Sequence, residues 1–169
     1  MQLKDIDKAT YRQHFKYTTF AVIAGLMVGA LSISSLLILF LGNNEGSNFN
    51  LNLAGVAITI VILAIVASQV KSKPYFAEIL YVSRLKFELS HINRKFKAIE
   101  KAAKSENTTA LDILAFYYQA TRQVWTLDDN TITMSELNSK EAKFFEQVNQ
   151  LNYQADANRY SRDLLAQFS

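Results

Sequence analysis

The chain has 169 residues, of which 50% are hydrophobic, and its formal net charge at pH 7 is +3. It contains no cysteine, which excludes disulfides, thiolate metal sites and cysteine nucleophiles. The apolar residues are concentrated in two uncharged segments, and this distribution argues against an ordinary soluble domain.

The two uncharged segments, residues 18–41 and 51–70, are each long enough to cross a membrane. They contain 24 and 20 residues, and at 1.5 Å per residue they reach roughly 36 and 30 Å, against a hydrocarbon core of about 30 Å. Apolar residues cover every face of both segments, whereas a surface helix of a soluble protein keeps a polar face. The first segment is too long for the apolar region of a cleaved signal peptide. We therefore expect two transmembrane helices, joined by a short external loop at residues 42–50.

Basic residues flank the predicted spans on one side only. Four Lys or Arg residues lie within residues 1–17, Lys71 and Lys73 follow the second span, and the loop contains none. The positive-inside rule then places both termini in the cytoplasm. The simplest setting is a multi-pass protein of the bacterial inner membrane, with residues 1–17 as an amphipathic cytoplasmic segment leading into the first span.

Residues 71–169 predict a cytoplasmic domain of about three antiparallel helices. From Val82 to Ala103, apolar residues recur at alternating spacings of three and four, and this heptad seam requires a helical partner along one edge. The partner belongs either to the same chain or to a second chain. A second helix starts near Thr109 and ends at residues 127–131. The predicted fold class is therefore all-α, with a transmembrane hairpin followed by a small helical bundle.

A third helix of this domain is predicted to begin at Thr133. Thr133 and Glu136 have the spacing of a capping box, and Ile132 and Leu137 are placed to form a hydrophobic staple across it. Ser161 is a candidate cap for a last short helix.

Small residues recur every fourth position in the first span, at Ala21, Gly25 and Gly29. This spacing lets another helix approach closely in lipid. The neighbour is either the second span of the same chain, whose Gly55 could face these residues, or another copy of the protein.

A basic face is predicted on the long cytoplasmic helix. Residues 71–104 contain nine basic and three acidic residues, whereas residues 105–169 contain five basic and nine acidic ones. The residues assigned to the basic face are Lys71, Lys73, Arg94, Lys97, Lys101 and Lys104. They indicate either contact with anionic lipid or a solvated face balanced by a neighbouring acidic helix. We expect no nucleic-acid partner, because the chain lacks the broader patch that such binding requires.

Aromatic and charged residues gather at Tyr118, Arg122, Trp125 and Asp129. Arg122 is placed to stack on Trp125 or Tyr118 and to pair with Asp129. The group is either a corner that binds a protein partner, since Trp, Tyr and Arg dominate binding hot spots, or a buried corner between helices.

Enzyme motifs are absent from the sequence. The two histidines form no HExxH pattern, and there is no P-loop, nucleophile elbow or dinucleotide fingerprint. We therefore expect no catalytic residue, metal site, cofactor or small-molecule substrate.

Several segments resemble a family of small two-span bacterial membrane proteins classed as a domain of unknown function. The resemblance rests on FYYQ at residues 116–119, RQVWTLDDNTIT at 122–133, LKDIDK at 3–8 and HINRK at 91–95. It covers nearly the whole chain and implies the same two-span topology, but no catalytic or binding residue.

Two functional hypotheses follow from these observations, besides a lipid-sensing module that uses the basic face. The first is a non-enzymatic inner-membrane adaptor or accessory subunit. In it the hairpin anchors the protein in the lipid bilayer, and the helical tail presents the heptad seam or the corner from Tyr118 to Trp125 to a protein partner. The alternative is a homo-oligomeric channel lined by the first span, with Gly25, Gly29, Ser32, Ser34 and Ser35 facing the pore.

Overall fold

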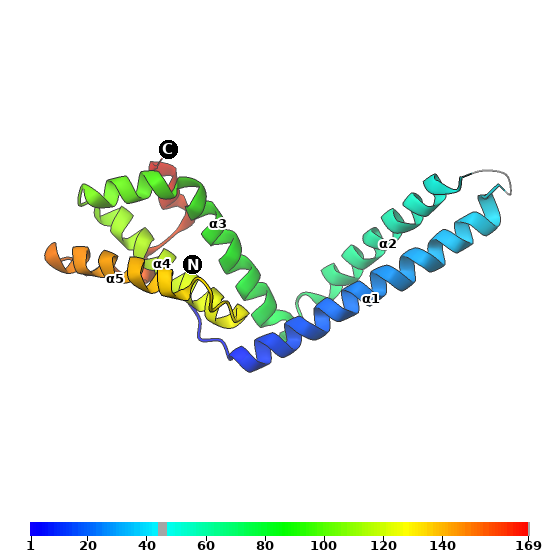
Figure 1. The fold of residues 1–169 in the computed structure, drawn as a ribbon, viewed down its shortest axis with the longest axis horizontal. Coiled ribbons are helices and arrows are strands. Elements are labelled where there is room, and N and C mark those ends of the chain that lie inside the picture. The colour runs from blue at the N-terminus through cyan, green and yellow to red at the C-terminus, as the bar shows by residue number, and fades with distance from the viewer. Residues whose placement is uncertain (44–46, 169) are drawn as a thin grey trace. The chain divides into compact units, whose positions relative to one another are not determined.

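The computed structural model describes residues 1–43 and 47–168, and within them the regular structure is helical, with no strand. The α-helices are α1 (Lys8–Leu41), α2 (Phe49–Val70), α3 (Ala77–Lys104), α4 (Thr108–Asp128) and α5 (Met134–Gln150) (Figure 1). Three short 3-10 helices complete the fold: η1 (Pro74–Phe76), η2 (Ala157–Arg159) and η3 (Arg162–Gln167). The all-α prediction is confirmed.

The chain divides into two compact units. The hairpin unit consists of residues 12–80, and the tail unit consists of residues 1–11 together with residues 81–168. The sequence predicts residues 1–17 as one separate segment. The structure instead places residues 1–11 with the tail, because Leu3, Ile6 and Tyr11 pack against its core.

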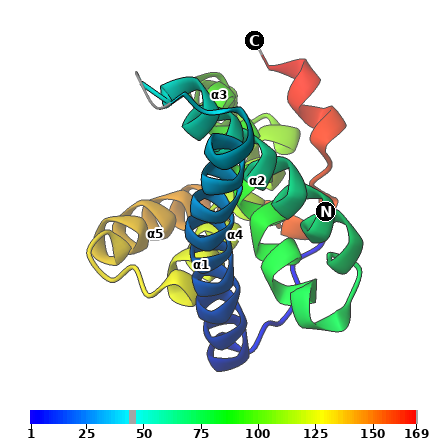
Figure 2. The ribbon, with the colours of Figure 1, turned by 90° about the vertical axis from the view of Figure 1, so that its right-hand side faces the viewer.

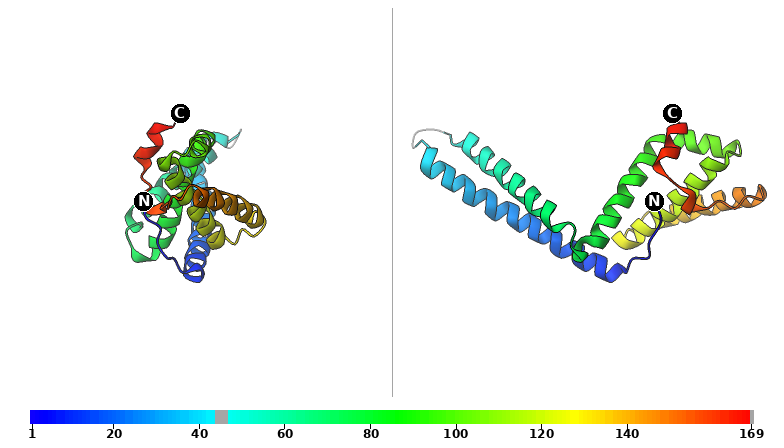
Figure 3. Two further views of the ribbon diagram at one scale, coloured as in Figure 1. Left: turned by 90° about the vertical axis from the view of Figure 1, so that its left-hand side faces the viewer. Right: turned by 180° about the vertical axis from the view of Figure 1, so that it is seen from behind.

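In the hairpin unit, α1 and α2 are long and apolar enough to cross a membrane. They lie side by side in every view (Figures 1, 2 and 3). Large apolar side chains point outward along both helices; Phe20 is 71% exposed and Leu39 is 75% exposed. Such exposure suits helices surrounded by lipid. Of the predicted loop at 42–50, residues 44–46 lie outside the described residues.

The chain turns back against α1 directly after α2. The ring of Tyr75 in η1 lies 4.0 Å from the ring of His14, centroid to centroid, and His14 Nδ1 lies 3.3 Å from Glu78 Oε2. Pro74 occupies the first turn of η1, where a missing N–H group costs nothing. Within the hairpin unit, these contacts hold η1 and the first turn of α3 against α1.

In the tail unit, α4 is the central helix, and it lies against α5 and η2. Twelve of its side chains are buried, on more than one face. The predicted seam of α3 is also buried within this chain: Val82, Leu85, Leu89, Ile92, Ile99 and Ala103 are all buried, and Phe96 is partly buried. The helical partner that the seam requires therefore comes from the same polypeptide.

Two predictions about the start of α5 are wrong. Thr133 has ψ near 0° instead of the extended backbone of a cap, and its side chain makes no capping hydrogen bond. Ile132 is 90% exposed, so it cannot form the staple with Leu137. Ser161 likewise makes no capping bond, and the last short helix is the 3-10 helix η3.

Candidate functional site

Tyr118 of the predicted partner corner is a core residue of the tail unit. It is 6% exposed, and its ring lies 5.2 Å from that of Phe144 on α5. Burial, assisted by the nearby negative charge of Glu100, raises the pKa of Tyr118 to about 12. The Tyr118 phenol is therefore neutral, and its ring packs between α4 and α5.

Arg122 links the same two helices. Its Nε donates to Glu141 Oε2 at 3.0 Å, and its Nη2 donates to Asn138 Oδ1 at 2.7 Å and also contacts Glu141. The predicted partner was Asp129. That prediction is wrong because α4 ends at Asp128 and Asp129 adopts the left-handed conformation, with φ of 63°. Trp125 is only partly buried and packs at the edge of the core.

Asp128 and Asp129 instead hold the N-terminal segment at the end of α4. Asp129 Oδ1 lies 2.8 Å from Lys8 Nζ, while Asp128 accepts from the Tyr11 hydroxyl at 3.0 Å and pairs with Lys86 Nζ at 2.6 Å. Carboxylates at a helix C-terminus face the negative end of its dipole, so these donors offset an unfavourable position. Of the predicted corner, Tyr118 and Arg122 thus contact α5, whereas Asp129 contacts the N-terminal segment.

A buried carboxylate on α3 is not among the site residues predicted from the sequence. Glu88 is 8% exposed, and its Oε2 accepts from the Tyr160 hydroxyl at 3.1 Å and from Arg162 Nε at 3.3 Å. Burial alone would raise the pKa of Glu88. The hydrogen bonds from Arg162 and Tyr160, together with the positive charge of Arg162, outweigh it, so that the net pKa is lowered.

A second buried carboxylate, Asp112, lies in the second turn of α4 and is 6% exposed. Its Oδ2 accepts from the Tyr153 hydroxyl at 3.0 Å, and its Oδ1 accepts from the backbone N–H of Asp156 at 2.9 Å. Arg159 Nη1 lies 3.6 Å from Oδ2. All three partners follow α5 in the sequence.

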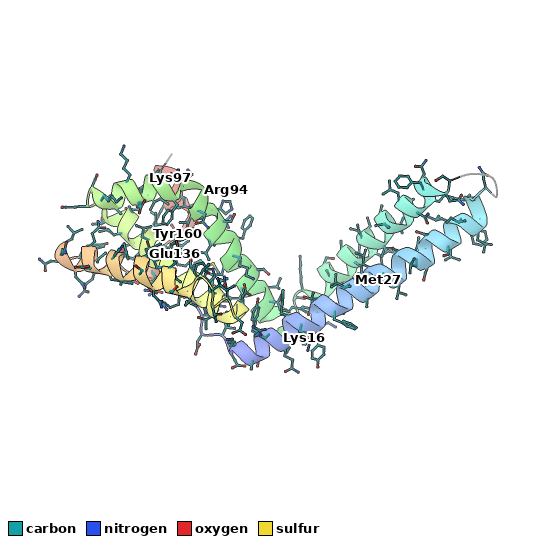
Figure 4. All side chains as sticks on the ribbon, in the orientation of Figure 1. Lys16, Met27, Arg94, Lys97, Glu136 and Tyr160 are labelled. Carbon is teal, nitrogen blue, oxygen red and sulfur yellow. The ribbon has the colours of Figure 1, made fainter. Side chains whose placement is uncertain are left out.

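Both carboxylates therefore hold one segment, residues 151–168, which we call the C-terminal strap. Figure 3 shows the strap, in red, beside α3, and Figure 4 labels Tyr160 within the tail unit. The ring of Tyr160 stacks on Phe116 at 4.1 Å, and Lys95 Nζ donates to the carbonyl groups of Leu165 and Phe168 at 3.0 and 2.6 Å. The N-terminal amine of Met1 donates to the Tyr160 carbonyl group at 3.0 Å. Residues 1–11 and the C-terminal strap thus both pack against α3 and α4.

One signal in the sequence could have revealed the strap. Glu88 directly precedes Leu89 of the apolar seam, and Asp112 stands between Leu111 and Ile113, so each interrupts a buried surface with a charge. A carboxylate in such a place requires a donor from elsewhere in the chain.

The predicted basic face is divided between the two units. Lys71 and Lys73 follow α2 in the hairpin unit, whereas Arg94, Lys97, Lys101 and Lys104 belong to α3 in the tail unit. All six are exposed. Among the described residues, none of the four on α3 forms an ion pair, so no neighbouring acidic helix neutralises them directly.

The small residues of the spans pack within the chain. A Cβ atom on Gly25 would lie 3.3 Å from Leu63 Cδ2, and one on Gly29 would lie 2.7 Å from Thr59 Cγ2. Gly55 of α2 lies against the backbone of Ser34, whose hydroxyl donates to the Asn52 carbonyl group at 3.2 Å. Ala21 is exposed. Three residues expected to line a channel, Gly25, Gly29 and Ser34, therefore face α2.

Comparison with known proteins gives one match. The family model described as Protein of unknown function (DUF3087) matches residues 1–165. No curated protein and no solved structure matches the chain. Within residues 1–43 and 47–168, no group of three or more His, Cys, Asp or Glu side chains is placed to hold a metal ion.

Proposed function

The chain belongs to the family of proteins of unknown function DUF3087, and we propose that it is a non-enzymatic membrane adaptor or accessory subunit. In this proposal the hairpin unit anchors the protein in the bacterial inner membrane. The distribution of Lys and Arg around the spans favours cytoplasmic locations for both termini. The tail unit then presents a folded surface to a protein partner.

The observation that carries the proposal is the closed core of the tail unit. Residues 1–11 and the C-terminal strap both pack onto α3 and α4, and the two buried carboxylates, Glu88 and Asp112, are occupied in holding the strap. Because both of these segments pack onto the helices, the outer surface of the domain is rigid. A rigid surface loses little conformational entropy when a partner binds.

The turn between α4 and α5 is the surface that we assign to the partner. Ile132 is 90% exposed there, and Trp125, which is partly buried, lies in the last turn of α4 before it. Aromatic residues are enriched at the centres of protein interfaces, and an exposed apolar neighbour adds area that binding would remove from water. Arg122 and Tyr118 join α4 to α5, the two helices that this turn connects, through their contacts with Glu141 and Phe144.

Site-specific photo-cross-linking in native membranes tests the proposal. A photoreactive residue at Ile132 should give one product that contains a second, different protein, and the double variant Trp125→Ala, Ile132→Ser should lose that partner. The same photoreactive residue at Ser139, which is exposed on α5, is the matched control and should not give the product.

The mass of the gently extracted protein provides the contrary outcome. A monomer or dimer with a stoichiometric second protein supports the adaptor. A closed ring of about four or more copies with no other chain bound would contradict it and favour the channel.

A further inference from the structure

The outward side of α3 carries one exposed aromatic residue and four cations. Phe87, Arg94, Lys97, Lys101 and Lys104 follow one another at spacings of seven, three, four and three. At 100° per residue these positions cover about 100° of the helix surface, roughly opposite the buried seam. We call this the α3 outer face. Figure 4 shows Arg94 and Lys97 at the edge of the tail unit.

The charge of this face is not neutralised within the tail. Lys97, Lys101 and the two other cations are exposed and form no ion pair among the residues that the structure describes. Six acidic groups of the tail are paired with bases outside the face: Glu88, Asp112, Asp128, Asp129, Glu136 and Glu141. Glu100 lies on α3 within about one turn of Lys97 and Lys104, but it forms no ion pair with them among the described residues. Four cations within about 15 Å of helix therefore attract an external anion.

An apolar group at one end makes the face amphipathic. Phe87 is 55% exposed, its ring meets His91 edge to face at 4.6 Å, and the guanidinium of Arg162 lies 5.3 Å from its centroid. The ring is therefore held in position while half of its surface stays open. Basic residues beside an exposed aromatic residue are typical of surfaces that bind the headgroup region of a membrane.

The position of α3 in the chain identifies the anion. Ala77, the first residue of α3, follows Val70, the last residue of α2, by seven positions. If the hairpin unit is embedded in a bilayer, as the proposed function requires, the face is tethered to that bilayer, and the effective concentration of headgroups is high. A soluble acidic partner would have no such advantage.

We infer that the α3 outer face binds the phosphate-bearing headgroups of anionic phospholipids. Each basic residue near an anionic surface contributes about a fivefold factor to the contact equilibrium. Contact requires that the face come within about one Debye length of the headgroups, which is 8–10 Å at ordinary ionic strength.

The absence of cysteine allows this to be tested with single labels in the full chain. Ser90 is exposed and lies on the face between Phe87 and Arg94, and Ser139 is an exposed control on α5. Ser90→Cys and Ser139→Cys, each carrying an environment-sensitive fluorophore, are reconstituted in nanodiscs. The discs contain either neutral phosphatidylcholine alone or one-third phosphatidylglycerol, together with a headgroup spin-label quencher.

We expect strong quenching of the Ser90 label in the anionic discs only, with its loss in 1 M salt, where the Debye length is about 3 Å. Lys97→Gln with Lys101→Gln should lower the contact equilibrium by up to about 25-fold. Lys143→Gln on α5 should leave it unchanged. Equal quenching in both kinds of disc, or no quenching at Ser90 in either, would overturn the assignment, and the second result would favour an acidic protein as the occupant.

A third label separates this inference from the membrane location on which it rests. Met27 is 62% exposed on α1 (Figure 4), so Met27→Cys should be quenched by an acyl-chain spin label in both kinds of disc. If Met27 is quenched and Ser90 is not, the hairpin is inserted and the lipid inference alone fails. If Met27 is not quenched, the membrane anchor itself is contradicted.

Discussion

Glu88 on α3 and Tyr160 in the C-terminal strap are 72 positions apart in the sequence, and the Tyr160 hydroxyl donates to the Glu88 carboxylate at 3.1 Å. Arg162 donates to the same carboxylate from the next turn of the strap. Because the carboxylate is buried, it is stabilised only while the strap supplies these donors. The structure of the strap and the ionisation of Glu88 are therefore coupled.

Replacing Glu88 with Gln should loosen the strap. The variant keeps an acceptor for Tyr160 but removes the charge that pairs with Arg162, whose side chain is 51% exposed. Because solvent weakens the pair, we expect a loss of about 1 kcal/mol. Trypsin should cut after Arg159 and Arg162 several-fold faster than in the parent chain, and hydrogen exchange at residues 157–168 should show the same change. Glu136→Gln, which removes an exposed pair with Lys140, should leave cleavage unchanged.

The Glu88 pair also predicts how the strap responds to acid. The folded-state pKa of Glu88 is lowered from its ordinary value of 4.5. Its contribution to stability is therefore complete above about pH 4.5 and is lost as the pH falls through the lowered folded-state pKa. Strap release measured by cleavage with an acid-active protease should rise below that pH. Glu88→Gln should reduce this rise, and an identical acid response in the variant would contradict the coupling.

Asp112 should be the stronger of the two anchors. Asp112→Ala removes the acceptor for the Tyr153 hydroxyl and for the Asp156 backbone N–H, and each donor then lacks a partner in a partly buried place. We expect a loss of about 2–4 kcal/mol, with a smaller loss for Tyr153→Phe, which removes only one of the donors. Denaturation of the full chain followed by the fluorescence of Trp125, the single tryptophan, measures both. Equal losses would show that the backbone bond to Asp156 contributes nothing.

Periodicity explains which parts of this fold could be predicted. The two spans, the buried seam from Val82 to Ala103 and the ends of α4 follow from spacing alone, because each is set by residues within a few turns of one another. The packing of Gly25 and Gly29 against α2 was one of two alternatives. Sequence alone could not choose between them, because the same small-residue row fits a second copy of the chain.

The strap could not be predicted in this way. Residues 151–168 form two 3-10 helices without an amphipathic repeat, and they are held by Glu88 and Asp112, which lie 41 or more positions away in the contacts described. The predicted pairing of Arg122 with Asp129 failed for a related reason. The sequence brought suitable groups together but could not show that Glu141, on another helix, competes for the guanidinium.

Of the three glycines that pack between α1 and α2, Gly55 should be the least replaceable. A Cβ atom at Gly55 would lie 2.8 Å from the backbone nitrogen of Ser34 and 2.9 Å from its Cα, so α1 itself would have to move. At Gly29 the nearest atom belongs to the side chain of Thr59, and at Gly25 it is the end of Leu63, 3.3 Å away. The free energy of unfolding of the detergent-extracted protein, measured by thermal denaturation, should therefore fall most for Gly55→Ala, by about 1–3 kcal/mol. It should fall less for Gly29→Ala and least for Gly25→Ala.

The exposed residue Ala57 supplies the control for that series. Ala57→Val adds volume to α2 on a side that is exposed in the structure, so it should leave the stability of the extracted hairpin nearly unchanged. A loss at Ala57 as large as the loss at Gly55 would mean that another chain covers this side, and that the intrachain packing is not the main contact of the spans.

The starts of α4 and α5 in the tail differ in their capping. At Asn107 the backbone is extended, with ψ of 112°, and the side chain accepts from the backbone N–H of Ala110 at 2.9 Å. Asn107→Ala should therefore destabilise the tail by about 1 kcal/mol. At Thr133, whose sequence pattern is the stronger, no capping bond forms, and the buried Oγ1 has no hydrogen-bond partner among the described residues. Thr133→Val should be neutral or slightly stabilising, because it replaces an unsatisfied hydroxyl with a methyl group of similar size. Denaturation curves of the two variants, measured in parallel, give the change in the free energy of unfolding for each. If Thr133→Val lost more stability than Asn107→Ala, Thr133 would act as a cap after all, and the backbone at the start of α5 would have to differ from the one described.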